Sequence, residues 1–165
     1  MTIKRLAIIS MLTAMAMVLS ILESFIPVFI PGVKLGLANV IILIMLYEFK
    51  PWEALLVDFL RIILVAIMRG TLLQPTFIMS FSGGMLSFFM MFIFSRFRIF
   101  SVIGVSVIGS ISHCLGQIIA AMIILSTEAV IYYLPFIAIL SLLTGVLSGC
   151  ICKAYLKRSI TQKFI

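Results

Sequence analysis

The residues of this sequence best suited to chemistry are Arg61 and Asp58, which lie within a largely apolar run over residues 52–68. A spacing of three residues places them on one face of a helix. Helical side chains lean toward the N-terminus of their helix, so Arg61 tilts toward Asp58. A guanidinium at the centre of a bilayer costs roughly 2.5–3.5 kcal/mol on insertion scales. Two interpretations follow: Asp58 neutralises Arg61 within the protein, or Arg61 binds a ligand or couples a conformational change.

The composition indicates what kind of protein holds these charges. Of the 165 residues, 64% are hydrophobic and 10% are charged, whereas soluble domains carry about 25% charged residues. The net charge of +7 does not indicate nucleic-acid binding, because the basic residues lie at the edges of apolar runs and form no continuous stripe. The sequence therefore predicts an all-α protein with one integral-membrane domain over residues 1–165.

Breaks in the apolar pattern divide the chain into six transmembrane helices, since a crossing needs roughly 17–25 apolar residues. The predicted spans are about residues 5–24, 35–49, 52–68, 75–94, 101–125 and 129–152. The first span resembles a secretory signal peptide, with a cleavage-like site at Ala14-Met15-Ala16. Its apolar run continues to Leu22, so we interpret it as a first transmembrane helix.

Lys and Arg fall unequally on the two sides of these spans. One side holds only Lys34 and Arg69. The other side holds nine basic residues: Lys4, Arg5, Lys50, Arg96, Arg98, Lys153, Lys157, Arg158 and Lys163. Because cytoplasmic loops are enriched in Lys and Arg, we expect a multi-pass protein of the cell membrane with both termini in the cytoplasm.

Polar residues gather in the predicted outward half of the bundle. Lys34 and Asn39 lie near the start of the second span, and Arg69 and Gln74 flank the third loop. Two basic groups there suit an anionic or phosphate-bearing ligand. Alternatively, Lys34 and Arg69 anchor the protein by extending to lipid headgroups.

On the fifth span, His113 and Gln117 share one helical face. A single His within a span either makes a packing hydrogen bond or contributes to a site. The predicted substrate-binding residues are Lys34, Asn39, Arg61, Arg69, Gln74, His113 and Gln117.

Motifs for catalysis, ATP binding and metal binding are missing from the sequence. There is no Walker-type loop, nucleophile elbow or zinc-protease helix. No Cys or carboxylate stands at ligand spacing from His113, and Cys150 and Cys152 point about 200° apart around a helix. We therefore predict that the chain is not an enzyme and uses no metal and no cofactor, so that any ATP hydrolysis would depend on partner proteins.

Small residues recur at four-residue spacing, a pattern that lets helices pack closely in lipid. The first span carries Ser10 and Ala14 at this spacing. The later spans carry Ser80–Gly84, Ser112–Gly116 and Ser141–Gly145–Gly149. Each stripe either packs inside the bundle or docks another membrane protein.

Several segments together resemble the membrane family labelled heptaprenyl diphosphate synthase component I, also called the Gx transporter family. The resemblance extends over about residues 5–150. It is carried by ESFIP at residues 23–27, PGVKLGLAN at residues 31–39, Leu60-Arg61, GTL at residues 70–72, SGG at residues 82–84 and SHCLGQ at residues 112–117. Cys114 stands where the family usually has Asn.

This family is similar to the substrate-binding S components of energy-coupling factor (ECF) transporters. The resemblance implies six helices, an outward substrate pocket, and partners consisting of a transmembrane T component and two cytoplasmic ATPases. It places Ser10 and Ala14 at the docking positions, with Ser10 in place of the customary Ala. The implied cargo is a small vitamin-like or isoprenoid/quinone-related metabolite.

The alternative is a non-transporting accessory subunit of prenyl diphosphate or menaquinone synthesis, or of flavin/quinone redox assembly. Synthase activity by the chain itself is not expected. Prenyl diphosphate synthases bind magnesium and diphosphate through Asp-rich motifs, and Asp58 is the single aspartate of this sequence.

Overall fold

The computed structural model describes residues 3–25, 36–97 and 99–163, which form helices and no strand. The all-α prediction is confirmed for these residues. Each of the first five predicted spans overlaps one α-helix, whereas the sixth overlaps a short 3-10 helix and the last α-helix. In chain order the elements are α1 (Ile3–Glu23), α2 (Asn39–Glu48), α3 (Pro51–Met68), α4 (Pro75–Ser95), α5 (Val102–Leu125), the 3-10 helix η1 (Glu128–Tyr133) and α6 (Leu134–Lys163).

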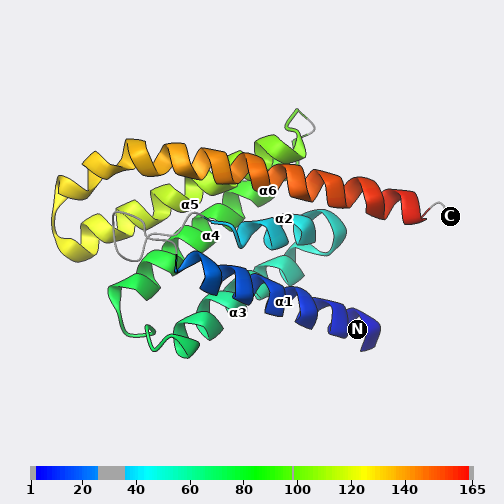
Figure 1. Cartoon of the computed structure of the whole chain (residues 1–165), viewed down its shortest axis with the longest axis horizontal. Helices are drawn as coiled ribbons and strands as arrows, with labels where there is room; N and C mark the ends of the chain where they lie inside the picture. The colour runs from blue at the N-terminus through cyan, green and yellow to red at the C-terminus, as the bar shows by residue number, and fades with distance from the viewer. Residues whose placement is uncertain (1–2, 26–35, 98, 164–165) are drawn as a thin grey trace.

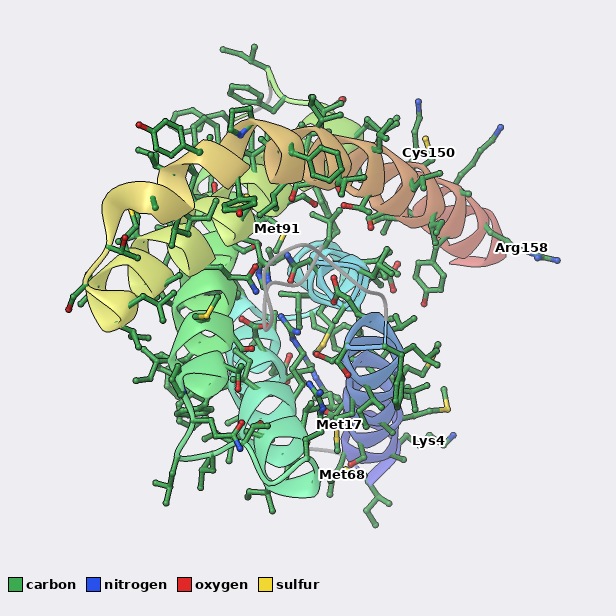
Figure 2. The ribbon with its side chains drawn as sticks, turned by 60° about the vertical axis from the view of Figure 1, so that its left-hand side comes forward. Lys4, Met17, Met68, Met91, Cys150 and Arg158 are labelled. Carbon is green, nitrogen blue, oxygen red and sulfur yellow. The ribbon has the colours of Figure 1, made fainter. Side chains whose placement is uncertain are left out.

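The short helix α2 lies at the centre of the bundle. It contacts α1, α3, α4, α5 and α6, and Figures 1 and 2 both show it between α1 and α6. All seven residues from Asn39 to Met45 are buried. The apolar run from Val40 to Met45 therefore forms the centre of the hydrophobic core.

The remaining helices follow one another around α2. Contacts join α1 to α3, α3 to α4, α4 to α5 and α5 to α6, whereas the described residues of α1 and α6 do not contact each other. Successive helices run in alternating directions, so both chain termini lie at the same end of the bundle (Figure 1). Which side of the membrane this end faces stays a prediction.

Four segments within the described residues are long and apolar enough to cross a membrane: α1, α4, α5 and Ala129–Arg158. The chain is therefore a multi-pass membrane protein. Helix α3 has 18 residues but carries three charged ones. Helix α2 has 10 residues, or about 15 Å, which is half of a ~30 Å hydrocarbon core. A full crossing by α2 and α3 stays a prediction.

The helices begin where the sequence predicts breaks. Pro51 and Pro75 stand in the first turns of α3 and α4, where the missing N–H of proline costs no hydrogen bond. The Glu53 carboxylate accepts from the Lys50 backbone N–H at 3.0 Å, and Ser101 Oγ accepts from the Gly104 N–H at 3.1 Å at the start of α5. Polar caps of this kind satisfy the free N–H groups of a helix start.

The small-residue stripes of α4, α5 and α6 pack inside the bundle. A Cβ added at Gly116 would lie 2.8 Å from the Ser82 carbonyl oxygen, and Ser82 Oγ donates to the Gly116 carbonyl at 2.9 Å. A Cβ at Gly149 would lie 2.7 Å from Ile103 Cα, and one at Gly84 would lie 2.6 Å from Ile62 Cδ1. These glycines therefore permit close approach of neighbouring helices.

The stripe on α1 differs, because Ser10 and Ala14 are both exposed. The buried face of α1 is formed instead by residues at alternating spacings of four and three: Ile9, Thr13, Ala16, Ser20 and Glu23. From the sequence, each stripe could either pack inside the bundle or dock another protein. Of these stripes, only the α1 pair lies on the surface of the bundle.

Candidate functional site

Arg61 and Asp58 form a buried ion pair. Arg61 Nη2 lies 2.6 Å from Asp58 Oδ1, and Arg61 Nε donates to the same oxygen at 2.7 Å. The two side chains are 4% and 1% exposed. Asp58 Oδ2 is also buried and has no hydrogen-bond partner among the described residues. The pairing that the spacing predicts is therefore present, and it leaves one carboxylate oxygen available for a further donor.

The Arg61 guanidinium contacts two other helices directly and a third through Asn39. Its Nη2 donates to Asn39 Oδ1 of α2 at 3.0 Å, and its Nη1 lies 3.5 Å from Ser20 Oγ of α1. Asn39 Nδ2 donates in turn to Ser87 Oγ of α4 at 2.9 Å. Arg61 thus stands at the centre of a hydrogen-bonded chain that joins α1, α2, α3 and α4.

The carboxylate of Glu23 connects the end of α1 to the start of α2. It accepts hydrogen bonds from the backbone N–H groups of Gly36 and Leu37, the latter at 3.1 Å. Glu23 is buried, and its negative charge lies near the N-terminus of α2, where the helix dipole favours an anion. Gly36 has φ of 85°, a left-handed conformation that glycine adopts without strain.

His113 and Gln117 of α5 face the same interior region. Both are buried. A Cβ added at Gly83 of α4 would lie 3.3 Å from His113 Cε1 and 2.7 Å from Gln117 Cγ. A Cβ added at Gly36 would lie 3.0 Å from Asn39 Nδ2 and 3.7 Å from His113 Cδ2. His113 therefore packs beside the start of α2, next to the Arg61 network.

These contacts define a polar core inside the membrane bundle, to which α1, α2, α3, α4 and α5 each contribute at least one side chain. Its members are Ser20, Glu23, Asn39, Asp58, Arg61, Ser87, His113 and Gln117. Buried polar groups in a membrane protein are costly and usually mark a ligand or ion pathway. This core offers charged, hydroxyl, amide and imidazole groups for hydrogen bonding to a polar ligand.

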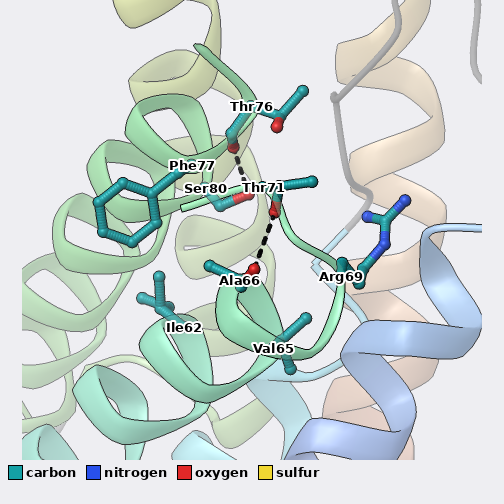
Figure 3. Close-up of a pocket in the computed structure, with 8 residues that line it drawn as sticks. All are labelled: Ile62, Val65, Ala66, Arg69, Thr71, Thr76, Phe77 and Ser80. Atoms are coloured by element: carbon teal, nitrogen blue, oxygen red, sulfur yellow. Dashed lines mark hydrogen bonds between the residues drawn. The ribbon is translucent and has the colours of Figure 1, made fainter. Parts of the chain in front are cut away.

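Two predicted binding residues lie away from this core, and a third cannot be placed. Arg69 and Gln74 are exposed and belong to the α3–α4 connection, and Lys34 falls outside the described residues. Arg69 borders a cavity of ≈ 20 Å³ together with Thr71, Thr76 and Ser80 (Figure 3). A cavity of this size holds about one water molecule, so it is too small for a metabolite.

Sequence reasoning missed Ser20 and Ser87 as members of the polar core. Ser20 could have been found from the repeat of small or polar residues along the buried face of α1 at positions 13, 16, 20 and 23. Ser87 continues the face of α4 that begins with Ser80 and Gly84. In both cases, small residues at helical spacing indicate a helix face that packs against other helices, and so identify the serine as buried.

Comparison with known proteins gives one match. The family model described as heptaprenyl diphosphate synthase component I matches residues 12–155. This range includes Ala14 and the whole polar core. Neither the comparison with curated proteins nor the comparison with solved structures gave a match.

Proposed function

Because the chain belongs to the heptaprenyl diphosphate synthase component I family, which is of Gx transporter type, we propose that it is the substrate-binding S component of an ECF importer. It captures a small polar metabolite, vitamin-like or related to isoprenoids or quinones, from outside the cell. Its partners are a transmembrane T component and two cytoplasmic ATPases, and the chain itself catalyses no reaction. The protein lies in the cell membrane, with both termini on the cytoplasmic side.

The observation that carries this proposal is the contrast between the small-residue stripes. Glycines on α4, α5 and α6 are used for packing inside the bundle, whereas Ser10 and Ala14 on α1 are exposed. In lipid, small residues allow close approach of another helix. The α1 pair is thus open to a helix of the T component, whereas the glycines of α4, α5 and α6 already contact neighbouring helices.

The polar core supports the capture of a ligand. Asn39, Arg61, His113 and Gln117 lie together in the interior. A ligand that enters between the helices can form hydrogen bonds with the side-chain amide of Asn39 and can donate one to the buried oxygen Oδ2 of Asp58. Arg69 and Gln74 lie on the connection between α3 and α4, where they are suited to a first encounter with the ligand.

Co-purification of the tagged chain from its own cells tests the proposed partnership. We expect the wild-type chain to bring down a T component and two ATPases, and Ala14→Leu to remove them because the added side chain blocks helix approach. Ala154→Leu on α6 is the matched control, since Ala154 is also exposed and the added volume is the same. Equal complex yield for the two variants would overturn the docking assignment.

A second candidate function follows from the description of the matched family, which names a component of a prenyl diphosphate synthase. In that case the chain is a non-transporting membrane subunit that supports prenyl-chain synthesis. The same co-purification separates the two functions. A soluble prenyltransferase recovered in place of the ATPases, with recovery unaffected by Ala14→Leu, would replace the transporter proposal.

The role of Arg61 in ligand binding needs a variant that keeps the bundle intact. Arg61→Ala alone leaves the Asp58 carboxylate buried without its partner, so loss of binding would be ambiguous. The double variant Asp58→Leu/Arg61→Met removes both charges together, which is often neutral for stability. Native mass spectrometry of the purified protein should show a retained small molecule in wild type and none in the folded double variant. Retention by the double variant would exclude Arg61 from the ligand site.

A further inference from the structure

A second site candidate lies at the end of the bundle that holds both termini, well away from the polar core. A cavity of ≈ 410 Å³ opens there between the start of α1, the α2–α3 connection and the end of α4. Three cationic side chains line it: Arg5, Lys50 and Arg96. This end is the one that the distribution of Lys and Arg predicts to be cytoplasmic.

The charge of the cavity is positive after its carboxylates are counted. Glu48 lines the cavity, and Glu53 pairs with Arg5 through an Nη2–Oε2 distance of 2.7 Å. Three cations therefore face two carboxylates. Lys50 and Arg96 are exposed, whereas Arg5 is paired with Glu53 and its Nε is buried. The cavity thus retains donors for an anionic group.

An apolar groove lies between α3 and α4 on the outer face of the bundle. Its larger part has a volume of ≈ 370 Å³ and its smaller part ≈ 190 Å³, and both parts include Trp52, Leu55 and Phe89. The lining of the groove extends along α4 from Phe81 to Phe92, a length of about 16 Å at 1.5 Å per residue. Every side chain that lines it is apolar.

The cationic cavity and the apolar groove meet. Pro51 lines both the cavity and the smaller part of the groove. Arg96, which lines the cavity, lies with its guanidinium carbon 5.0 Å from the ring centroid of Phe92, which lines the groove. A cationic pocket that continues into an aromatic groove matches a ligand with an anionic head and a hydrocarbon tail.

We propose that this surface is a binding site for an anionic phospholipid, with the phosphate in the cavity of Arg5, Lys50 and Arg96 and one acyl chain in the α3–α4 groove. Anionic lipids are concentrated in the cytoplasmic leaflet, and basic pockets between transmembrane helices bind their headgroups. The site is independent of the proposed transport function, because none of its lining residues belongs to the polar core or to the exposed Ser10/Ala14 face of α1. A polyprenyl diphosphate has the same overall chemistry and is the competing occupant.

The test is native mass spectrometry of the full chain released from vesicles that contain equal amounts of phosphatidylglycerol and phosphatidylcholine with identical acyl chains. We expect wild type to retain phosphatidylglycerol in preference. Lys50→Gln/Arg96→Gln should weaken its apparent affinity by roughly twenty-five-fold, the product of about fivefold for each cation near an anionic surface. The matched control is Lys153→Gln/Arg158→Gln, which removes one exposed Lys and one exposed Arg of α6 and should leave retention unchanged.

A second pair of variants tests the groove. Phe89→Ala should reduce retention of phosphatidylglycerol, because Phe89 lines both parts of the groove, and Phe136→Ala, at an exposed aromatic residue of α6, should not. Equal retention of the two lipids by wild type would overturn the proposal, as would equal losses in the Lys/Arg variant and its control. Farnesyl diphosphate added as a competitor should leave the bound phospholipid in place. If it displaces the lipid at equimolar concentration, a prenyl diphosphate replaces the phospholipid as the occupant.

Discussion

Asp58 and Arg61 should be coupled far more strongly than the partly exposed pair Arg5–Glu53, although the N–O distances of the two pairs are nearly the same. Arg61 Nη2–Asp58 Oδ1 measures 2.6 Å with side chains 4% and 1% exposed. Arg5 Nη2–Glu53 Oε2 measures 2.7 Å with side chains 38% and 15% exposed. The two pairs differ in burial and also in placement, since Asp58 and Arg61 both lie on α3 whereas Arg5 and Glu53 join α1 to α3.

The expected magnitudes follow from that difference. Removing one partner of a buried pair leaves an uncompensated charge and costs about 3–5 kcal/mol, whereas replacing both partners by apolar residues is often neutral. Arg61→Met should therefore lower the free energy of unfolding by about 3–5 kcal/mol, and Asp58→Leu by a similar amount. In the double variant Asn39 and Ser20 still lose a donor, and hydrogen bonds between helices in membranes average about 0.6 kcal/mol. The double variant should thus lose only about 1–3 kcal/mol, which leaves a coupling energy of at least about 3 kcal/mol.

A double-mutant cycle measures this coupling directly. The free energy of unfolding is obtained for wild type, both single variants and the double variant by titrating detergent micelles with a denaturing detergent while following helix content. The same cycle with Arg5→Met and Glu53→Leu is the control, and its coupling energy should be under about 1 kcal/mol because the pair is partly exposed. If the two cycles give equal coupling energies, Asp58 and Arg61 are solvated in the folded protein and the buried network described above is wrong.

Three further predictions concern helix packing at Gly116, the α1–α2 junction at Glu23, and Arg69 on the α3–α4 connection. Gly116→Ala should lower the free energy of unfolding by about 1–3 kcal/mol, because the new Cβ would lie 2.8 Å from a backbone oxygen. Gly104→Ala should be tolerated, because the atom nearest to its new Cβ would lie 3.6 Å away. Thermal unfolding of both variants measures this difference. Glu23→Gln should destabilise the fold by about 1–2 kcal/mol, because the amide oxygen still accepts from Gly36 and Leu37 but without the negative charge. Faster hydrogen exchange at those two amides would show that the loss is local. Arg69→Gln should leave thermal stability unchanged, since Arg69 is exposed. The variant should slow the association of an anionic ligand, and an unchanged association rate would show that Arg69 does not attract the ligand.

Most of the fold follows from hydrophobic pattern and breaks alone. The predicted spans and the observed helices agree because Pro51, Pro75 and Ser101 start helices by local chemistry that does not depend on tertiary contacts. The sixth span, expected over residues 129–152, is the least accurate, because the 3-10 helix η1 occupies Glu128–Tyr133 and α6 extends from Leu134 to Lys163. The second span was expected from residue 35. Gly36 adopts a positive φ and its N–H is bound by Glu23, so the chain turns there and α2 begins at Asn39.

The site was less predictable than the fold, since it depends on which helical faces meet. The i, i+3 spacing predicted the contact between Asp58 and Arg61 because both lie on one helix. The contact of Arg61 with Asn39 joins residues 22 positions apart, and the one between Asn39 and Ser87 spans 48 positions. Both contacts form only because α2 lies at the centre of the bundle. The apolar sequence of α2 is compatible with that position but does not determine which helix faces contact it.

The ion pair also constrains the chemistry of any ligand bound in the polar core. Asp58 already neutralises Arg61, and the guanidinium directs Nε, Nη1 and Nη2 toward Asp58, Ser20 and Asn39. A carboxylate or phosphate placed beside Arg61 would have to displace Asp58, which would then be a buried anion without a partner. A neutral polar group avoids that cost, because it can accept from the amide of Asn39 and donate to the buried oxygen Oδ2 of Asp58. Any preference for an anionic ligand should therefore arise from the exposed Arg69 on the α3–α4 connection, while the interior selects by hydrogen bonding.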